Sequence, residues 1–547
     1  MKKATWQRVA AALLIAVMLL GVTGCSKDED GDIIQFTMFG AMPQPEINDD
    51  NEIMNLIAEK VGVKVKETWL TGQTAAEAIG TIIAGGDYPD FIDGGEAMMA
   101  LYDEGVLVPW DDYLEKYPNL KALFTDQEWD ALRQDDGKIY WANQFQNNYG
   151  ENRATTHNDE AFWIQVRVLE WAGYPEINTL DEYYDVLTRY AEANPTMPDG
   201  TKVIPYTMLC DDWRYFCIEN APQFLDGYPN DGSVIVDKEN VKIVDYNTTP
   251  TAKRYFTKLN EEYKKGTIDI EFATQTYDEY IAKLSTGAVL GMCDQWWDFY
   301  GTVNDTFKQQ GLDLLGCNYV PLGLTIDEGM ENRWHTYGDT LNVSSGIAVT
   351  TSCKDPDAAF KFMNDILDQE IHDLRFWGVK DVDYLVDDDG MFYKTPEMRM
   401  QWADKSYQAS HRCLYAYFPQ WRGTSRDGKN AMMPEEQTSE FFSDLAEPLR
   451  KCFEAYGANN YPDMIGSVVE ENAPWFPMYS YSNAMTTATP GGVAWTKMGE
   501  VKHEWLPRIV MAEDFEAAWE QYMAAYNAVN PQDFLSEMQE ELDRRAS

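Results

Sequence analysis

The fold of this chain is decided by a stretch that begins Ile33-Ile34-Gln35-Phe36-Thr37-Met38-Phe39 and continues to residue 93. The opening seven residues are β-rich, and residues 46–61 follow with helical spacing of apolar side chains. Residues 63–69 alternate as a strand, residues 74–84 have a helical pattern that stops at two glycines, and residues 88–93 form a short apolar run. This order of strand, helix, strand, helix and strand predicts a parallel sheet with crossover helices.

The carboxyl ends of the predicted strands are the expected place for a ligand. In open α/β sheets, ligands bind in the crevice beyond those ends. Phe39 ends the first predicted strand and Asp93 ends the third. Both residues are therefore candidate ligand-binding positions.

The start of the chain has the order of a secretory signal. Basic residues at 2, 3 and 8 precede an uninterrupted apolar run from 9 to 20. Val22-Thr23-Gly24-Cys25 then resembles the bacterial lipobox, in which the chain is cleaved before the cysteine and the thiol is diacylated. We therefore predict a signal peptide over 1–24, a lipidated Cys25 (carrying palmitate-like chains) and a tether over 25–32. The alternative is an ordinary signal peptide that happens to be followed by cysteine.

Composition restricts the class of function. The chain has 547 residues, 44 basic and 91 acidic, with a net charge of −47. Such a surface repels nucleic acid phosphates and anionic lipid headgroups, so we expect no nucleic acid partner and membrane attachment only through the lipid anchor. No C-x-x-C pair or Cys/His cluster has zinc spacing, and Asp387-Asp388-Asp389-Gly390 fits a hairpin turn better than a calcium loop. We predict no metal and no cofactor.

Several segments between residues 33 and 370 contain motifs of known type. They are Ala84-Gly85-Gly86-Asp87-Tyr88-Pro89-Asp90, residues 104–114, Asp136-Gly137-Lys138-Ile139-Tyr140, residues 163–172 and 179–183, Gly287-Ala288-Val289-Leu290-Gly291-Met292, Ser345-Gly346-Ile347-Ala348-Val349 and residues 355–362. In this order they resemble segments of ABC-transporter extracellular solute-binding proteins for sugars. The chain departs from the family pattern at Gly291, where alanine is usual, and residues 210–228 match nothing.

The resemblance implies a two-lobe, periplasmic-binding-protein-like α/β fold of type II. Central mixed sheets flanked by helices are expected in each lobe, with a hinge between the lobes. We assign residues 33–148 and 320–370 to lobe 1, and residues 149–319 and 371–547 to lobe 2. The ligand is expected in a cleft between the lobes, and the partner is the permease of an ABC importer. We expect a monomer.

Sugar recognition sets the candidate site residues. A sugar offers apolar C–H faces to aromatic rings and a rim of hydroxyls to polar side chains. Treating residues 293–298 as extended, we predict that Trp296 and Asp294 share a face and bind the ligand. Trp141 with Asn143, and Trp213, are further candidates. For each tryptophan the alternative is a place in the hydrophobic core.

The predicted function is a lipid-anchored protein on the extracytoplasmic face of a cell membrane. It captures a carbohydrate, an oligosaccharide by preference, and delivers it to an ABC importer; no enzymatic activity is expected. One alternative is a receptor of the same fold for a peptide or other polar solute. A secreted carbohydrate-active enzyme is the other, since acidic, Trp-rich chains are found there too, but the sequence contains no catalytic motif.

Overall fold

A computed structural model describes residues 33–546, apart from 146, 152, 158, 230–233, 338–340, 467–468, 472 and 484. The predicted signal peptide, Cys25 and tether lie outside the described residues. The chain divides into two compact units, the first made of residues up to 148, 345–379 and 406–421, and the second of residues 149–344, 380–405 and from 422 onward. No helix among the described residues combines the length and the apolar character needed to cross a bilayer.

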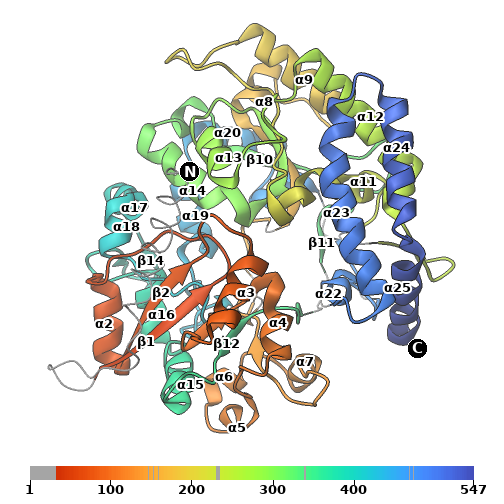
Figure 1. The fold of residues 1–547 in the computed structure, drawn as a ribbon. Helices are drawn as coiled ribbons and strands as arrows, with labels where there is room; N and C mark the ends of the chain where they lie inside the picture. Colours follow the sequence, from red (N-terminus) through yellow and green to blue (C-terminus); the bar gives the residue numbers. More distant parts are fainter. Residues whose placement is uncertain are drawn as a thin grey trace, which may run out of the picture. The chain divides into compact units, whose positions relative to one another are not determined.

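The first unit is built on a five-stranded mixed sheet (Figure 1), in the order β2-β1-β3-β12-β4. Strand β1 runs parallel to β2 and β3, while β12 is antiparallel to β3 and β4. The predicted mixed α/β architecture is confirmed in this unit. The strands are β1 (Ile34–Gly40), β2 (Val63–Trp69), β3 (Phe91–Asp93), β4 (Trp141–Ala142) and β12 (Ile347–Val349).

The crossover helices of this unit end where the sequence indicates, but the helix predicted over residues 46–61 begins only at Glu52, after its Asn51 N-cap. Thr74 caps α3 with a capping box to Glu77, and Gly62 ends α2 in the left-handed conformation. Asp355 caps α15, whose first residue is Pro356. The helices are α2 (Glu52–Val61), α3 (Ala75–Gly85), η1 (Gly95–Ala97), α4 (Met98–Asp103), α5 (Asp111–Leu114), α6 (Pro118–Lys121), α7 (Asp126–Ala131), α15 (Pro356–Asp365) and α16 (Gln369–Phe376).

The second unit has a three-stranded antiparallel sheet in the order β10-β6-β9, made of β10 (Tyr319–Leu322), β6 (Glu160–Gln165) and β9 (Gly291–Gln295). This pairing corrects the predicted lobe boundaries. Residues 320–344 belong to the second unit, because β10 pairs with β6 and not with the sheet of the first unit. The chain re-enters the first unit at Ser345, and residues 371–379 and 406–421 also belong there.

Short two-stranded sheets and many helices complete the second unit. A turn at Asp389–Gly390 joins β13 to β14, so the predicted hairpin is confirmed. The remaining strands are β7 (Ile235–Asp237), β8 (Lys242–Val244), β11 (Thr336–Tyr337), β13 (Leu385–Val386), β14 (Phe392–Tyr393), β15 (Arg422–Gly423) and β16 (Val469–Glu470). Two elements span a boundary between the units, namely β5 (Asn148–Tyr149) and α18 (Lys405–Ser410).

Helices α23 to α25 are drawn in blue in Figure 1; α24 and α25 both pack on α23, and α23 and α24 pack on α12. Because of this packing, the C-terminal segment is part of the second unit and not a separate tail. The longer helices are α8 (Val166–Ala172), α9 (Leu180–Ala193), α12 (Pro250–Lys265), α13 (Tyr277–Ser285), α14 (Trp296–Gln310), α17 (Pro396–Ala403), α19 (Thr438–Asp444), α20 (Glu447–Tyr456), α23 (Pro490–Met511), α24 (Phe515–Ala528) and α25 (Pro531–Ala546). The shorter ones are η2 (Asp212–Tyr215), α10 (Phe216–Glu219), α11 (Ala221–Leu225), η3 (Tyr246–Thr248), η4 (Asp313–Leu315), η5 (Pro434–Glu436), α21 (Tyr461–Ile465) and α22 (Tyr479–Ser482).

Gly291 has a structural reason to replace the usual alanine. A Cβ atom there would lie 2.2 Å from the Tyr183 hydroxyl oxygen and 2.9 Å from the Trp163 carbonyl oxygen, which that hydroxyl contacts at 2.7 Å. We expect Gly291→Ala to lower the free energy of unfolding by about 1–3 kcal/mol, the usual range for overpacking, in a urea titration.

Two further variants test the cause of that loss. Adding Tyr183→Phe removes the clashing oxygen and should recover part of the stability lost in Gly291→Ala. Gly301→Ala in α14 is the control, since an added Cβ there meets nothing within 4 Å and should leave stability equal or slightly higher. Wild-type stability in Gly291→Ala would contradict this explanation.

Candidate functional site

The carboxyl edge of the first sheet carries a small aromatic group. The register places Gly40, Trp69 and Asp93 beside one another at the ends of β1, β2 and β3. A Cβ atom at position 40 would lie 2.5 Å from the Trp69 ring, so only glycine lets the indole lie against β1. The Trp69 ring meets Tyr417 edge-on at 5.1 Å, and Tyr417 in turn meets the exposed ring of Phe145 at 5.3 Å.

Asp93 organises the loop that follows β4. Its carboxylate accepts hydrogen bonds from the Gly95 backbone N–H and from Gln144 Nε2, both at 2.9 Å. Burial raises the pKa of Asp93, and these two hydrogen bonds offset part of that rise. Asn143 Oδ1 accepts from the Phe145 backbone N–H at 2.9 Å, which fixes the loop bearing the exposed ring. Asp93 and Asn143 therefore hold this edge together from beneath the surface.

In the second unit, β9 ends in a buried carboxylate. Asp294 is 0% exposed and accepts hydrogen bonds from Tyr280 Oη at 2.6 Å, Cys217 Sγ at 3.4 Å and the Gln295 backbone N–H at 2.7 Å. Burial raises the pKa of Asp294 well above its usual value, and the neighbouring Asp298 carboxyl raises it further. Its partners come from the protein interior, so this side chain offers no acceptor to solvent.

An aromatic platform lies next to this carboxylate, and we define it as Trp213, Phe216 and Trp297. The indoles of Trp213 and Trp297 are near-parallel, with ring centroids 5.8 Å apart and planes 17° apart. Phe216 stacks on Trp213 at 5.8 Å and 25°. The Trp297 side chain is 40% exposed, and its indole Nε1 donates to Gln295 Oε1. Trp213 and Phe216 are half-buried, so Trp297 is the ring that the platform exposes, and an exposed indole is suited to covering by a flat apolar face.

A buried cation holds the platform in position. The Arg214 guanidinium lies 4.4 Å from the Trp213 ring centre and 4.0 Å from that of Tyr277, and its Nε donates to Asp298 Oδ1 at 2.9 Å. Tyr277 Oη donates to the Asp298 backbone carbonyl at 2.7 Å. Arg214 is 5% exposed and Asp298 3%. This ion pair fixes η2 to the start of α14, and with them the two indoles of the platform.

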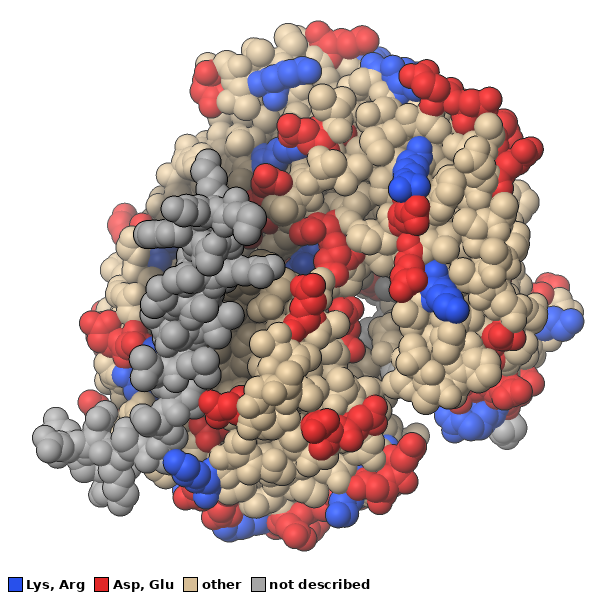
Figure 2. Space-filling view, in the orientation of Figure 1, with Lys and Arg blue, Asp and Glu red and all other residues tan. Residues whose placement is uncertain are grey.

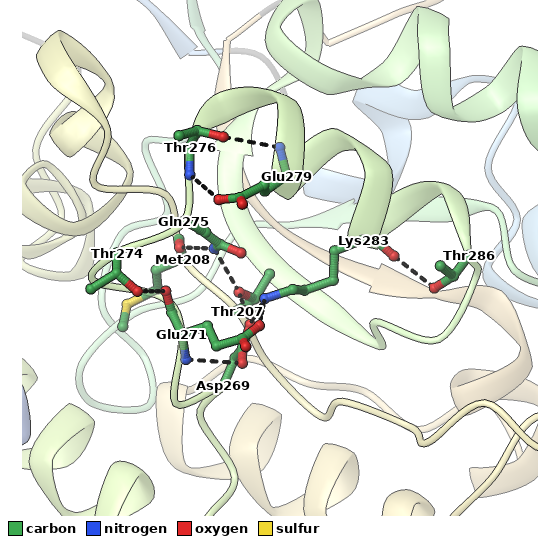
Figure 3. Close-up of polar contacts among 10 residues, drawn as sticks. All are labelled: Thr207, Met208, Asp269, Glu271, Thr274, Gln275, Thr276, Glu279, Lys283 and Thr286. Atoms are coloured by element: carbon green, nitrogen blue, oxygen red, sulfur yellow. Dashed lines mark hydrogen bonds and ion pairs between the residues drawn. The ribbon is translucent and has the colours of Figure 1, made fainter. Parts of the chain in front are cut away.

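Helix α13, which supplies Tyr277 and Tyr280, is anchored by the polar network of Figure 3. Thr276 and Glu279 form a capping box at its first turn, and Lys283 pairs with Asp269 at 2.5 Å. Gln275 Nε2 donates to Thr207 Oγ1 at 3.1 Å and to the Met208 carbonyl at 2.7 Å. Gln275 thus fastens the start of the helix to residues 207–208 and Lys283 fastens its last turn to Asp269, which fixes where its tyrosines project.

No family model and no curated protein matches the sequence. Solved structures do match over nearly the whole length. The alginate-binding protein AlgQ2 without calcium ion is 15% identical, with a TM-score of 0.62, over 94% of this chain and 99% of its own. The substrate-binding protein FusA of S. pneumoniae in complex with kestose is 18% identical, with a TM-score of 0.62, over 93% and 99%.

An extracellular solute-binding protein from Bifidobacterium longum subsp. infantis is 15% identical, with a TM-score of 0.61, over 95% of this chain and all of its own. The chain has the two-lobe fold of ABC-transporter solute-binding proteins. The predicted fold is therefore confirmed. At these sequence identities the similarity establishes only the fold. The ligand and the site residues are inferred from the geometry described above.

Within this fold, Asp294 and Trp296 are not arranged as the sequence predicts. Residues 293–298 are not one extended segment, because α14 begins at Trp296. Asp294 and Trp296 therefore do not share the face of a strand. The Trp296 ring packs on Tyr300, with ring centroids 3.3 Å apart, and on Tyr461 at 4.7 Å, whereas Trp297 is the exposed indole.

The other predicted positions are distributed over both units. Trp141 is fully buried in the core of the first unit and meets Tyr102 edge-on at 6.2 Å, so the core alternative describes its position. Phe39 is half-buried at the end of β1. Trp213 belongs to the platform. Sequence reasoning missed Trp297, Phe216 and Phe145; their ligand roles, like those of the predicted residues, stay predictions.

One group of potential metal ligands occurs among the described residues. Donor atoms of Cys217, Asp294 and Asp298 lie within 4.8 Å of one another, and all three residues are buried. Tyr280 and Arg214 already supply a hydrogen-bond donor and a positive charge to the two carboxyls. The three residues therefore form an interior hydrogen-bonding and ion-pair network. Their two carboxyls are also too deeply buried to act as the acid and base of a glycosidase.

Proposed function

We propose that this protein is an extracytoplasmic receptor of an ABC importer that captures an oligosaccharide and delivers it to the permease. The observation that carries the proposal is the stacked pair of indoles, exposed Trp297 on half-buried Trp213, on a chain whose fold is that of solute-binding proteins. Aromatic rings of this kind bind the C–H face of a sugar. The full-length likeness to proteins solved with kestose and with Man1GlcNAc supports a saccharide ligand.

The surface supports an extracytoplasmic setting. Acidic side chains are spread over the face drawn in Figure 2, in keeping with 91 acidic and 44 basic residues in the chain. Such a surface keeps a protein soluble and monomeric and repels anionic lipids. We propose that attachment depends on acylation of Cys25, because two acyl chains hold a protein on a membrane where one does not.

A thermal-shift screen of the full-length protein, purified in mild detergent, tests ligand capture. The panel holds neutral oligosaccharides, acidic oligosaccharides, amino acids and short peptides. A ligand at 100 times its dissociation constant should stabilise the protein by about 2.7 kcal/mol, a rise of a few degrees in Tm. We expect a shift with an oligosaccharide that chromatography then recovers intact.

Other outcomes of that screen separate the alternatives. A shift with peptides alone would keep the fold and replace the ligand class. Steady consumption of a glycan would identify an enzyme instead. For the anchor, growth with an alkyne-tagged palmitate analogue should label the wild type and not Cys25→Ser, whereas equal labelling of the two would contradict the assignment.

A further inference from the structure

The charges around the aromatic platform are arranged in an unusual way. Among the described residues, Arg214 is the cation in contact with its rings, and this guanidinium is buried and already paired with Asp298. The polar residues that lead into the platform on its own segment are Asp211 and Asp212, both only half-buried. In the described part of the chain, the charged groups beside the platform are therefore two half-buried carboxylates and a guanidinium that is already paired.

The partners of these two carboxylates leave them able to accept hydrogen bonds. Asp211 uses Oδ2 to accept from the Tyr277 backbone N–H at 2.8 Å. Burial raises the pKa of Asp212, and the adjacent Asp211 carboxyl raises it further, which is the effect of two like charges placed close together. Arg214 and His503 also interact electrostatically with Asp212, and His503 Nε2 lies 2.8 Å from the Cys210 carbonyl oxygen.

We infer that the Trp213–Trp297 platform receives an uncharged sugar ring and discriminates against acidic saccharides such as uronates. This inference rests on the proposed function and adds the charge class of the ligand. A neutral ring presents hydroxyl donors to Asp211 and Asp212, and charge-assisted hydrogen bonds of this kind are stronger than neutral ones. A uronate presents a carboxylate to the same two groups, and like charges brought together in a partly desolvated site repel each other.

Calorimetric titration of the full-length protein tests the inference with a matched pair of ligands. The first ligand is the neutral oligosaccharide found by the screen, and the second is the same oligosaccharide with its primary hydroxyls oxidised to carboxylates. Linkage and length are then identical, and only charge differs. We expect the oxidised form to bind at least about tenfold more weakly at low ionic strength, and the difference to shrink in salt.

Variants identify the groups responsible. The double variant Asp211→Asn/Asp212→Asn keeps oxygen acceptors but removes both charges. The dissociation constant of the oxidised ligand divided by that of the neutral ligand should therefore fall severalfold. Glu170→Gln/Glu176→Gln removes two exposed charges elsewhere on the second unit and should leave the ratio unchanged. Trp297→Ala should weaken neutral binding about tenfold or more, whereas Trp171→Ala, which removes a 44% exposed indole on α8, should not.

Each outcome has one meaning. Equal or tighter binding of the oxidised ligand, or an unchanged ratio in the Asp211/Asp212 double variant, overturns the inference while saccharide capture stands. Equal binding by Trp297→Ala and wild type, with unfolding temperatures matched, removes the platform from the site. Failure of every saccharide to bind overturns the proposed function, and the inference with it.

Discussion

Replacing Arg375 by methionine is expected to lower the free energy of unfolding of the first unit by about 3–5 kcal/mol. The guanidinium is fully buried and donates hydrogen bonds to the carbonyl oxygens of Leu414 and Pro419, both at 2.8 Å, of Tyr415 at 2.9 Å and of Ile366 at 3.2 Å. Methionine fills much of the space but leaves these carbonyls without a donor. Unsatisfied buried acceptors are costly, and here several are created at once.

The charge state of Arg375 supports a large effect. Burial lowers the pKa of Arg375 to about 10, so the side chain is still protonated at neutral pH and keeps all its donors. Burial also raises the pKa of Glu67 to about 8, and Arg375 offsets part of that rise. Because this pKa leaves Glu67 mainly protonated at neutral pH, the loss of its interaction with Arg375 adds to the destabilisation mainly above about pH 8.

Urea unfolding followed by circular dichroism gives the stability change, and amide hydrogen exchange over residues 414–419 shows whether that segment loosens. A drop of roughly ten degrees in Tm is expected for a unit of this size. Arg133→Met is the control in the same unit, because its ion pairs with Asp111 and Asp130 are partly exposed and should contribute less than about 1 kcal/mol. Equal stability of the two variants would refute the role assigned to Arg375.

The contacts of Arg375 explain why the place of residues 406–421 in the first unit could not be predicted from the sequence. The first unit could be predicted from local patterns, since β1 and β2 are each followed by a helix with a side-chain N-cap and the order of elements sets the topology. No local pattern places residues 406–421 in that unit. The segment is held by hydrogen bonds from Arg375, about 40 positions away in the sequence, and such long-range pairing leaves no periodic trace.

The predicted return to the first lobe near residue 320 failed for a related reason. The run Tyr319–Leu322 is apolar enough to serve as a strand in either sheet, and only its antiparallel partner, β6, decides which one. Strand propensity measures how well a segment fits a half-buried surface and does not specify the neighbour.

At the platform, the sequence did contain a usable pattern. Apolar residues at 296, 299, 300, 303 and 307 have the spacing of an amphipathic helix that begins at Trp296. Such a helix turns Trp296 inward and places Trp297 off the apolar stripe, as the structure has it. By contrast, the stacking of Trp213 on Trp297 joins segments more than eighty residues apart, and no spacing predicts it.

Replacing Lys502 by methionine is expected to cost about 3–5 kcal/mol in the second unit. Lys502 lies in α23 and is fully buried, and its ammonium group pairs with the Glu219 carboxylate in α10. Tyr246 Oη also donates to that carboxylate, at 2.9 Å. Without the lysine, a buried carboxylate keeps one hydrogen bond but loses its counter-charge, and thermal unfolding of the variant measures the consequence.

A double-mutant cycle isolates the cause. Glu219→Leu alone leaves the ammonium buried and unpaired, so it should cost a similar amount, whereas Lys502→Met/Glu219→Leu removes both charges and should recover most of the loss. Lys253→Met is the matched control: its exposed pair with Glu516 also joins α12 to a C-terminal helix, and it should change stability by less than about 1 kcal/mol. Additive losses in the double variant would show that Lys502 acts through packing, since a coupled ion pair requires the second substitution to compensate for the first.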